Sequence, residues 1–174
     1  LEGKLANTPV RCILSENGKL WFSTKRGVVL FDGKIIQSMQ KRDGLAGNFV
    51  EQIYQDRSGD IWITSENGIT RYHPTGVAPA VFLDDVVAER RYGPIREISI
   101  PSTTGFLRFE FRGLSIKTRP DQWRYLYRLE GYDADWQQTK EGQVEYTDLS
   151  SGEYTFQVKA VDRDLNYSEA PATV

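Results

Sequence analysis

The sequence is poor in the residues on which many catalytic and metal sites depend. Its 174 residues include one cysteine, one histidine and one methionine. Cys12 cannot form an internal disulfide, and its apolar surroundings, VRCIL, predict a small buried side chain. His73 has no second histidine or cysteine with which to bind a metal ion, and no nucleophile elbow accompanies it. We therefore predict no catalytic residues, no metal ligands and no cofactor, and the sequence names no ligand-binding residue.

Strong charge and long hydrophobic runs are also missing. The net charge is −2 and the basic residues are scattered, which argues against nucleic acid as a partner. No apolar run approaches the roughly 18 residues that span a bilayer. The chain starts at Leu1 without an initiator methionine or a signal peptide, so we interpret it as a segment of a larger protein. A single cysteine does not decide between a reducing and an oxidising compartment.

The sequence does contain an internal repeat. Residues 18–31, GKLWFSTKRGVVLF, recur without a gap 41 positions later as residues 59–72, GDIWITSENGITRY. Trp21 and Trp62 occupy the same place in the two copies. A period of about 40 to 50 residues is the size of one four-stranded propeller blade.

Turn signals in both copies agree with a meander of short strands. The dipeptides NG at 17–18 and SG at 58–59, then RG at 26–27 and NG at 67–68, are typical of tight turns in which glycine supplies a positive φ. The strands predicted between them cover residues 20–24, 28–31, 61–65 and 69–72. Trp21 and Trp62 are expected in the blade core between neighbouring blades. A sugar-stacking role would require exposure at the propeller mouth.

Residues 43–74, DGLAGNFVEQIYQDRSGDIWITSENGITRYHP, resemble the two-component regulator propeller repeat. The first copy departs from that pattern at Ser15, Lys19 and Leu30. We count two blades in residues 1–75, and the sequence leaves open whether the first blade has its first strand. WD-repeat propellers have blades of similar size, but their Gly-His and Trp-Asp pairs are absent here. The residues that carry the resemblance are Gly44, Leu45, Asp56, Gly59, Ile61, Trp62, Ile63, Gly68, Ile69, Arg71 and Tyr72.

The period ends at a linker, and a different pattern follows. Residues 73–79, HPTGVAP, contain two prolines and a glycine. Residues 76–174 then show strands of period two, separated by turns, which predict an antiparallel β-sandwich of the immunoglobulin or fibronectin type. The fold class is therefore all-β. The residues expected to face inward are Leu107, Phe109 and Phe111, then Trp123, Tyr125, Tyr127 and Leu129, then Tyr154, Phe156, Val158 and Ala160.

Residues 123–162 are similar to the Y_Y_Y domain. Its first signature is matched by Tyr125, Tyr127, Leu129, Gly131, Asp133 and Trp136, and its second by Tyr146, Leu149, Gly152, Tyr154 and Phe156. The segment DLSSGEY at 148–154 is also typical of a tyrosine corner. Tyr154 is accordingly expected to be buried, with its hydroxyl bonded to nearby backbone.

Two acidic clusters invite catalytic or metal-binding interpretations. Asp133 and Asp135 near Trp136 suggest glycoside hydrolysis, but residues two apart on one loop are poorly placed to flank a sugar, and the resemblance implies a turn-and-core feature. The segment DRDLN at 162–166 starts like a calcium loop. Tyr167 then stands where glycine is needed, and no glutamate completes the ligand set. We predict a hairpin turn there.

The paired resemblances imply a non-enzymatic part of a periplasmic sensor from a bacterial hybrid two-component system. In such proteins the propeller recognises a signal, commonly an oligosaccharide, and the Y_Y_Y domain couples it to a transmembrane helix and a histidine kinase. The partners implied are a second copy of the chain, in a homodimer or higher association, and the rest of the parent sensor. Two alternatives remain open at this stage: an accessory sandwich of a propeller lyase or hydrolase, and a protein-interaction adaptor.

Overall fold

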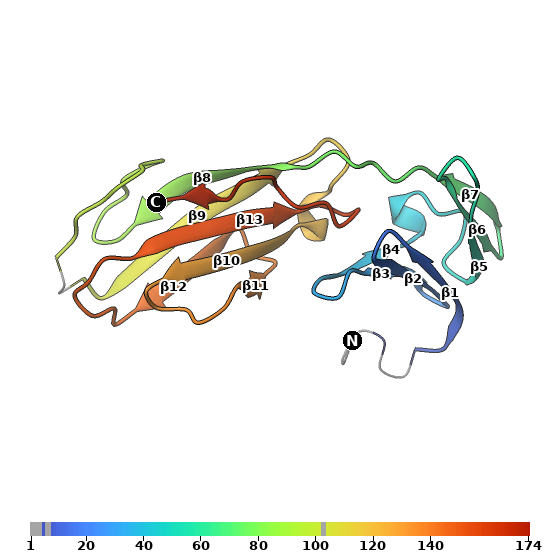
Figure 1. The fold of residues 1–174 in the computed structure, drawn as a ribbon, viewed down its shortest axis with the longest axis horizontal. Coiled ribbons are helices and arrows are strands. Elements are labelled where there is room, and N and C mark those ends of the chain that lie inside the picture. Colours follow the sequence, from blue (N-terminus) through green and yellow to red (C-terminus); the bar gives the residue numbers. More distant parts are fainter. Residues whose placement is uncertain (1–4, 6–7, 102–103) are drawn as a thin grey trace. The chain divides into compact units, whose positions relative to one another are not determined.

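Strands and tight turns form nearly all of the regular structure (Figure 1). The computed structural model describes residue 5, residues 8–101 and residues 104–174. Its helical segments are two short 3-10 turns, Lys41–Asp43 and Pro120–Gln122. In the described residues no helix has the length and apolar character required to cross a membrane. The chain divides into two units, Leu1–Gly76 and Val77–Val174, and the all-β prediction is confirmed.

Two antiparallel sheets make up the first unit. The first sheet has the strand order β1-β2-β3-β4, so the first copy of the repeat does have its first strand. The second sheet has the order β5-β6-β7. The strands are β1 (Val10–Glu16), β2 (Lys19–Thr24), β3 (Gly27–Phe31), β4 (Ile36–Met39), β5 (Val50–Gln55), β6 (Ile61–Ser65) and β7 (Gly68–Tyr72).

The repeat in the sequence is a repeat in the backbone. Strand β7 lies 41 residues after β3, and glycine begins both strands with a positive φ, 109° at Gly27 and 133° at Gly68. Thr24 and Ser65 precede these glycines by three residues, and each hydroxyl donates to the following glycine carbonyl, over 2.8 and 3.1 Å. The turns predicted from these dipeptides are confirmed.

The first strands of the two copies follow a different offset. Leu14 pairs with Trp21, whereas Tyr54 pairs with Trp62, so β1 and β5 correspond at 40 residues rather than 41. The turn between β5 and β6 therefore has one extra residue. It begins at Asp56, which the first copy does not match. This extra residue gives Trp62 surroundings that Trp21 does not have.

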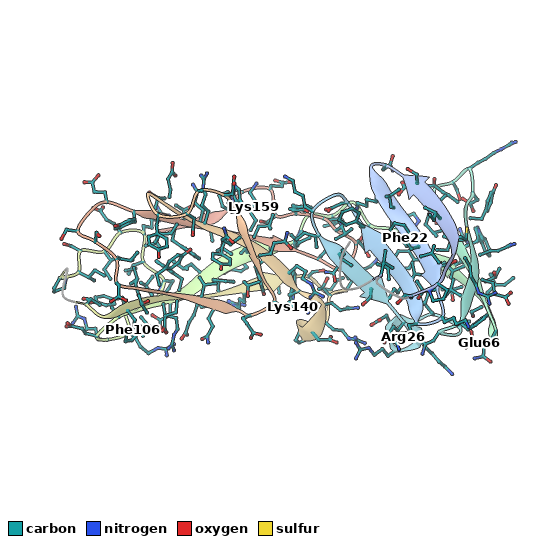
Figure 2. All side chains as sticks on the ribbon, turned by 90° about the horizontal axis from the view of Figure 1, so that it is seen from below. Phe22, Arg26, Glu66, Phe106, Lys140 and Lys159 are labelled. Carbon is teal, nitrogen blue, oxygen red and sulfur yellow. The ribbon has the colours of Figure 1, made fainter. Side chains whose placement is uncertain are left out.

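Loop 44–49 is fastened to the second sheet through the turn between β6 and β7. Glu66, labelled in Figure 2, accepts the backbone N–H groups of Asn48 at 3.2 Å and Phe49 at 2.8 Å. The hydroxyl of Thr70 accepts the N–H of Ala46 at 2.8 Å. These bonds satisfy backbone groups of the loop that no neighbouring strand pairs.

The second unit is a β-sandwich. One sheet has the strand order β12-β9-β8 and the other the order β11-β10-β13-β14. Phe109 of β9 and Phe156 of β13 stack across the interior with ring centroids 3.9 Å apart, so the two sheets share one core. The strands are β8 (Ala80–Val87), β9 (Phe106–Leu114), β10 (Arg124–Glu130), β11 (Gln137–Thr139), β12 (Gln143–Thr147), β13 (Thr155–Val161) and β14 (Ala172–Thr173).

The predicted inward sets form most of this core. Their members are buried or pack against the buried cluster, because alternate residues of a strand point to the same face. The tyrosine corner is also present, since the Tyr154 hydroxyl donates to the carbonyl oxygen of Ser150 over 2.9 Å. The expected burial of Tyr154 is wrong. It is half-buried, because it lies one residue before β13, at the end of the sandwich.

Candidate functional site

Asp56 organises the turn that leads into β6. Its Oδ1 accepts the backbone N–H groups of Ser58 and Asp60 and the hydroxyl hydrogen of Ser58. Its Oδ2 accepts the indole N–H of Trp62 at 2.7 Å. The bonds from the Ser58 hydroxyl and the Trp62 indole lower the pKa of Asp56 to about 2. In the first copy, the buried Nε1 of Trp21 has no hydrogen-bond partner among the described residues.

Asp60 lies at the other end of this turn and is buried. Arg71 donates to its Oδ2 from Nε at 2.6 Å, and Nδ1 of His73 lies 2.6 Å from its Oδ1. The bonds from His73 and then Arg71 lower the pKa of Asp60. Sequence reasoning missed this role, although a carboxylate between Gly59 and the buried Ile61 is a signal that could have revealed it.

The turn at Asp56 and Asp60 brings a serine, a histidine and two aspartates close together. Their arrangement is not that of a serine hydrolase. In a Ser-His-Asp triad the histidine contacts the serine that attacks the substrate. Here His73 contacts Asp60, while the Ser58 hydroxyl donates to Asp56 at 2.6 Å. The imidazole of His73 is 72% exposed at the first residue of the linker. His73 therefore fixes the end of the blade to its turn.

Trp21 and Trp62 differ in burial, and the prediction for Trp62 is wrong. Trp21 is 1% exposed, as expected for a residue in the blade core. Trp62 is 37% exposed, and the Arg71 guanidinium lies 5.7 Å from its ring centroid. Tyr54 and Ile69, which lie on the same face of the second sheet, are more exposed still. No described strand covers this face.

Asp133 is a structural group in the sandwich. Its Oδ2 accepts the backbone N–H of Leu129 at 2.7 Å and the hydroxyl hydrogen of Tyr146 at 2.6 Å. Burial, and then the bond to Asp133, raises the pKa of Tyr146 well above its usual value. Asp135 is exposed. The structure does not pair these carboxylates across a cleft, as glycoside hydrolysis requires.

Trp136 occupies a different place from the one the resemblance implied. It is half-buried and lies outside the core, with the Arg128 guanidinium 5.3 Å and the Lys159 ammonium 5.9 Å from its ring centroid. Lys159 is labelled on β13 in Figure 2. It pairs with Leu126, on the outward side of β10. Trp136 therefore covers the outward side of the sheet, and its core assignment is wrong.

The segment 162–166 forms a turn, as predicted. The Asp162 carboxylate accepts the N–H groups of Asp164 and Asn166 and the side-chain amide of Asn166, at 2.8 to 2.9 Å. Burial raises the pKa of Asp162. Leu165 adopts a positive φ of 60°, and Val161 bridges Tyr167 beyond the turn. Among the described residues no group of three or more metal-ligating side chains is found.

Cys12 is half-buried and unpaired with another sulfur. Its thiol donates to the carbonyl oxygen of Ile53 at 3.6 Å, and its N–H donates to the hydroxyl of Ser23 at 2.8 Å. These bonds join β1 to its neighbour β2 and to β5 of the second sheet. Full burial was predicted, but the thiol lies at the edge of the contact between the sheets.

A recess lies beside the tyrosine corner of the sandwich. It has a volume of about 920 Å³, and residues 96–101 and 148–156 contribute much of its wall. None of the residues that line it is a histidine or a cysteine. The chain's one histidine and one cysteine are both in the first unit.

Comparison with known families confirms both resemblances. Residues 44–67 match the two component regulator propeller, and residues 116–174 match the Y_Y_Y domain. The propeller match covers part of the second copy of the repeat. The assignment of the first copy to the same kind of blade rests on the internal repetition of the sequence. No curated protein matches the chain.

One solved structure shares the fold. The extracellular domain of BT3049 from B. thetaiotaomicron, described as a hybrid two component system, aligns at 20% identity with a TM-score of 0.54. The alignment covers 96% of this chain and 26% of that chain. The extracellular domain of BT4673 from the same organism aligns at 17% identity with a TM-score of 0.45, over 99% of this chain and 25% of that chain. The present chain thus spans about a quarter of each.

Proposed function

We propose that this chain, which carries a two-component regulator propeller repeat followed by a Y_Y_Y domain, is part of the extracytoplasmic sensing region of a bacterial two-component sensor. The observation that carries the proposal is the order of the two family matches in one polypeptide. The fold likeness to one larger extracellular domain extends over both units. The inner membrane is the expected location of the parent protein.

In this proposal the two units have different tasks. The blades contribute to a larger propeller that binds the signal, for which an oligosaccharide is the expected class. The sandwich transmits the bound state to a membrane helix and a histidine kinase, through a pair of sensor chains. A ligand can drive such a change only if it binds one arrangement of the pair more tightly than the other.

The contacts at the junction suit this role. His73, the first residue of the proline-containing linker, is held by Asp60 of the blade, so a displacement of the blade reaches the linker directly. The sandwich has one aromatic core shared by both sheets, which favours movement as a rigid body. The side chains of Asp56, Asp60, His73, Asp133 and Asp162 are engaged in structural bonds, consistent with a non-catalytic role.

The first experiment is the molar mass of the chain in solution, measured by light scattering on a sizing column. The variant Ile69→Glu is measured beside it, because a charge at this exposed blade position disfavours association through the blades. A dimer that persists in Ile69→Glu supports pairing through the sandwich. If the unchanged chain is a monomer at high concentration, that result would contradict signalling through a paired sandwich and favour the adaptor function.

The gene supplies a second, independent test. A membrane-spanning segment followed by a kinase, encoded after Val174 in the full reading frame, is the expected result. A catalytic domain of the lyase or hydrolase type in place of a kinase would overturn the sensor proposal.

A further inference from the structure

Basic side chains gather at one end of the first sheet. Lys25 and Arg26 form the turn between β2 and β3, and Arg11 lies near the start of β1, which pairs with β2 beside this turn. Lys41 follows β4, and the side-chain amide of Gln40 donates to the carbonyl oxygen of Arg26 at 3.3 Å, which holds this segment against the turn. All four basic residues are exposed. Positive charges from three segments of the chain therefore share one end of the sheet.

Two of these cations share one aromatic ring. The Arg11 guanidinium lies 4.3 Å and the Lys25 ammonium 5.9 Å from the ring centroid of Phe49. The ring is itself fixed, because Glu66, which lies at the same end of the unit as Arg26 (Figure 2), accepts the N–H of Phe49 at 2.8 Å. The ring attracts each cation but carries no net negative charge, and the two like charges repel each other. An anion that contacts both groups removes this repulsion.

The carboxylates at this end do not neutralise the four cations. Glu66 accepts two backbone N–H groups of loop 44–49, and Asp43 accepts the N–H of Gln40 at 2.8 Å. Glu51 is exposed at the start of β5. Within the described part of the chain, none of the four basic side chains forms an ion pair with a carboxylate. Their charge is therefore available to a ligand.

The basic character is not a property of the repeat. The positions that hold Arg11, Lys25 and Arg26 in the first copy hold acidic or amide residues in the second, namely Glu51, Glu66 and Asn67. Arg11 and Glu51 both lie where the register of the first strand shifts, and such bulges redirect side chains. The backbone is thus the same in both copies while the charge is opposite. Blade architecture does not require these cations, which favours a role in binding.

Neutral polar groups lie beside the cations. Asn48 and Asn67 are exposed, and both side chains are held in place: Oδ1 of Asn48 accepts the N–H of Lys41 at 2.7 Å, and Nδ2 of Asn67 donates to Glu66 at 3.3 Å. Each amide keeps further capacity to bond hydroxyl groups. Blades of a propeller are arranged around a central channel, so the turns at the blade ends face its mouths rather than the neighbouring sheets. Further blades would leave this end accessible.

We propose that Arg11, Lys25, Arg26 and Lys41, here called the Arg11 site, bind the acidic group of an anionic oligosaccharide. A carboxylate or a sulfate supplies the oxygen pair that a guanidinium binds through two parallel N–H groups, and the lysines add charge. The saccharide part of this inference rests on the proposed function, in which an oligosaccharide is the expected signal. The anionic part rests on the cations themselves. A neutral sugar carries no charge to match them.

Amide chemical shifts of the whole chain provide the test. The probes are tetragalacturonate, sulfated maltotetraose, neutral maltotetraose and inorganic sulfate. At low salt, one or both acidic sugars should shift the resonances of the turn 25–26 and of loop 44–49, and added salt should weaken the binding. Arg11→Gln and Lys25→Gln should each weaken it by about fivefold. Both side chains are exposed, so the fold is expected to persist. The more tightly bound sugar identifies the acidic group as carboxylate or sulfate.

The control is Arg57→Gln, the same loss of charge at an exposed residue in the turn between β5 and β6. It should bind the acidic sugars like the unchanged chain. Equal weakening in this control, equal binding of neutral maltotetraose, or no shift with either acidic sugar would overturn the Arg11 site. Inorganic sulfate that binds as tightly as the sulfated sugar would mean an adventitious ion only. None of these results touches the sensor proposal, which the gene and the molar mass test separately.

Discussion

Trp21 of β2 and Tyr72 of β7 meet edge to face, at a centroid separation of 5.8 Å and an interplanar angle of 63°. The two residues come from different copies of the repeat, so this contact joins the two sheets of the first unit. Trp62 holds the same place in the second copy and has no such partner among the described residues. Identical motif positions thus have different environments.

This difference predicts unequal costs for the same substitution. Trp21→Ala should destabilise the first unit by about 3–5 kcal/mol, because it leaves a cavity between two packed sheets. Trp62→Ala should cost about 1 kcal/mol, since that ring is partly exposed and loses mainly its bond to Asp56. Denaturant unfolding of both variants at low protein concentration measures the costs. Equal losses would contradict the assignment of the covered and uncovered faces.

The tyrosine corner is expected to contribute a modest amount to the sandwich. Tyr154→Phe keeps the ring but removes the hydroxyl that donates to Ser150, and should cost about 1 kcal/mol. Thermal unfolding of the second unit reports the loss. Tyr132→Phe is a suitable control, because Tyr132 is exposed. A loss as large in the control as in the variant would argue against a role for the corner bond.

Tyr146 is expected to stay protonated in alkaline solution. Its phenol is desolvated and donates to Asp133, and both effects raise its pKa. In an absorbance titration of the folded protein, the change up to about pH 11 should be the same for Tyr146→Phe as for the unchanged chain. A smaller change in the variant would mean that Tyr146 ionises with the other tyrosines.

Asp162 is expected to be important for the stability of the sandwich through its turn. Asp162→Ala leaves two backbone N–H groups without an acceptor, which should cost about 2–3 kcal/mol. Asp135→Ala, on an exposed loop, should be nearly neutral. Millimolar calcium should leave the melting temperature of both unchanged. A calcium-dependent rise that Asp162→Ala abolishes would instead indicate a metal loop.

Acid should weaken the turn that begins at Asp56. A carboxyl whose pKa is lower in the folded than in the unfolded chain stabilises the fold above its unfolded pKa. This stabilisation is lost as the pH falls through the folded pKa, which is about 2 for Asp56. The melting temperature of the first unit should therefore fall between about pH 4 and pH 2. Asp56→Asn should show a flatter dependence over this range, and an equally steep one would exclude this carboxyl as a source.

Features governed by local chemistry could be predicted from the sequence. Gly27 and Gly68 mark their turns because they adopt a positive φ that other residues rarely adopt. Phe109 and Phe156 were assignable to the core because alternation along a strand decides which face a residue joins. The family resemblances followed from the same residues, since turns and core positions make up both motifs.

Features that depend on residues far away in the sequence could not be predicted. Trp62 has the same local sequence context as Trp21, but burial depends on whether another sheet lies on that face. Trp136 follows a loop, so strand alternation does not predict which way its side chain points. In the structure the ring lies on the outward side of β10. The bonding partners of Asp60 are Arg71 and His73, which lie 11 and 13 residues further along the chain.

The extra residue in the second copy has a consequence for the order of the Trp62 side chain. Because the turn begins with Asp56, the indole of Trp62 is already held by a hydrogen bond in the absence of a partner. A side chain that is ordered in advance loses little rotational freedom when another surface arrives, so less of the contact energy is spent on fixing it. One inserted residue thus fixes the orientation of Trp62 by a hydrogen bond that Trp21 does not make.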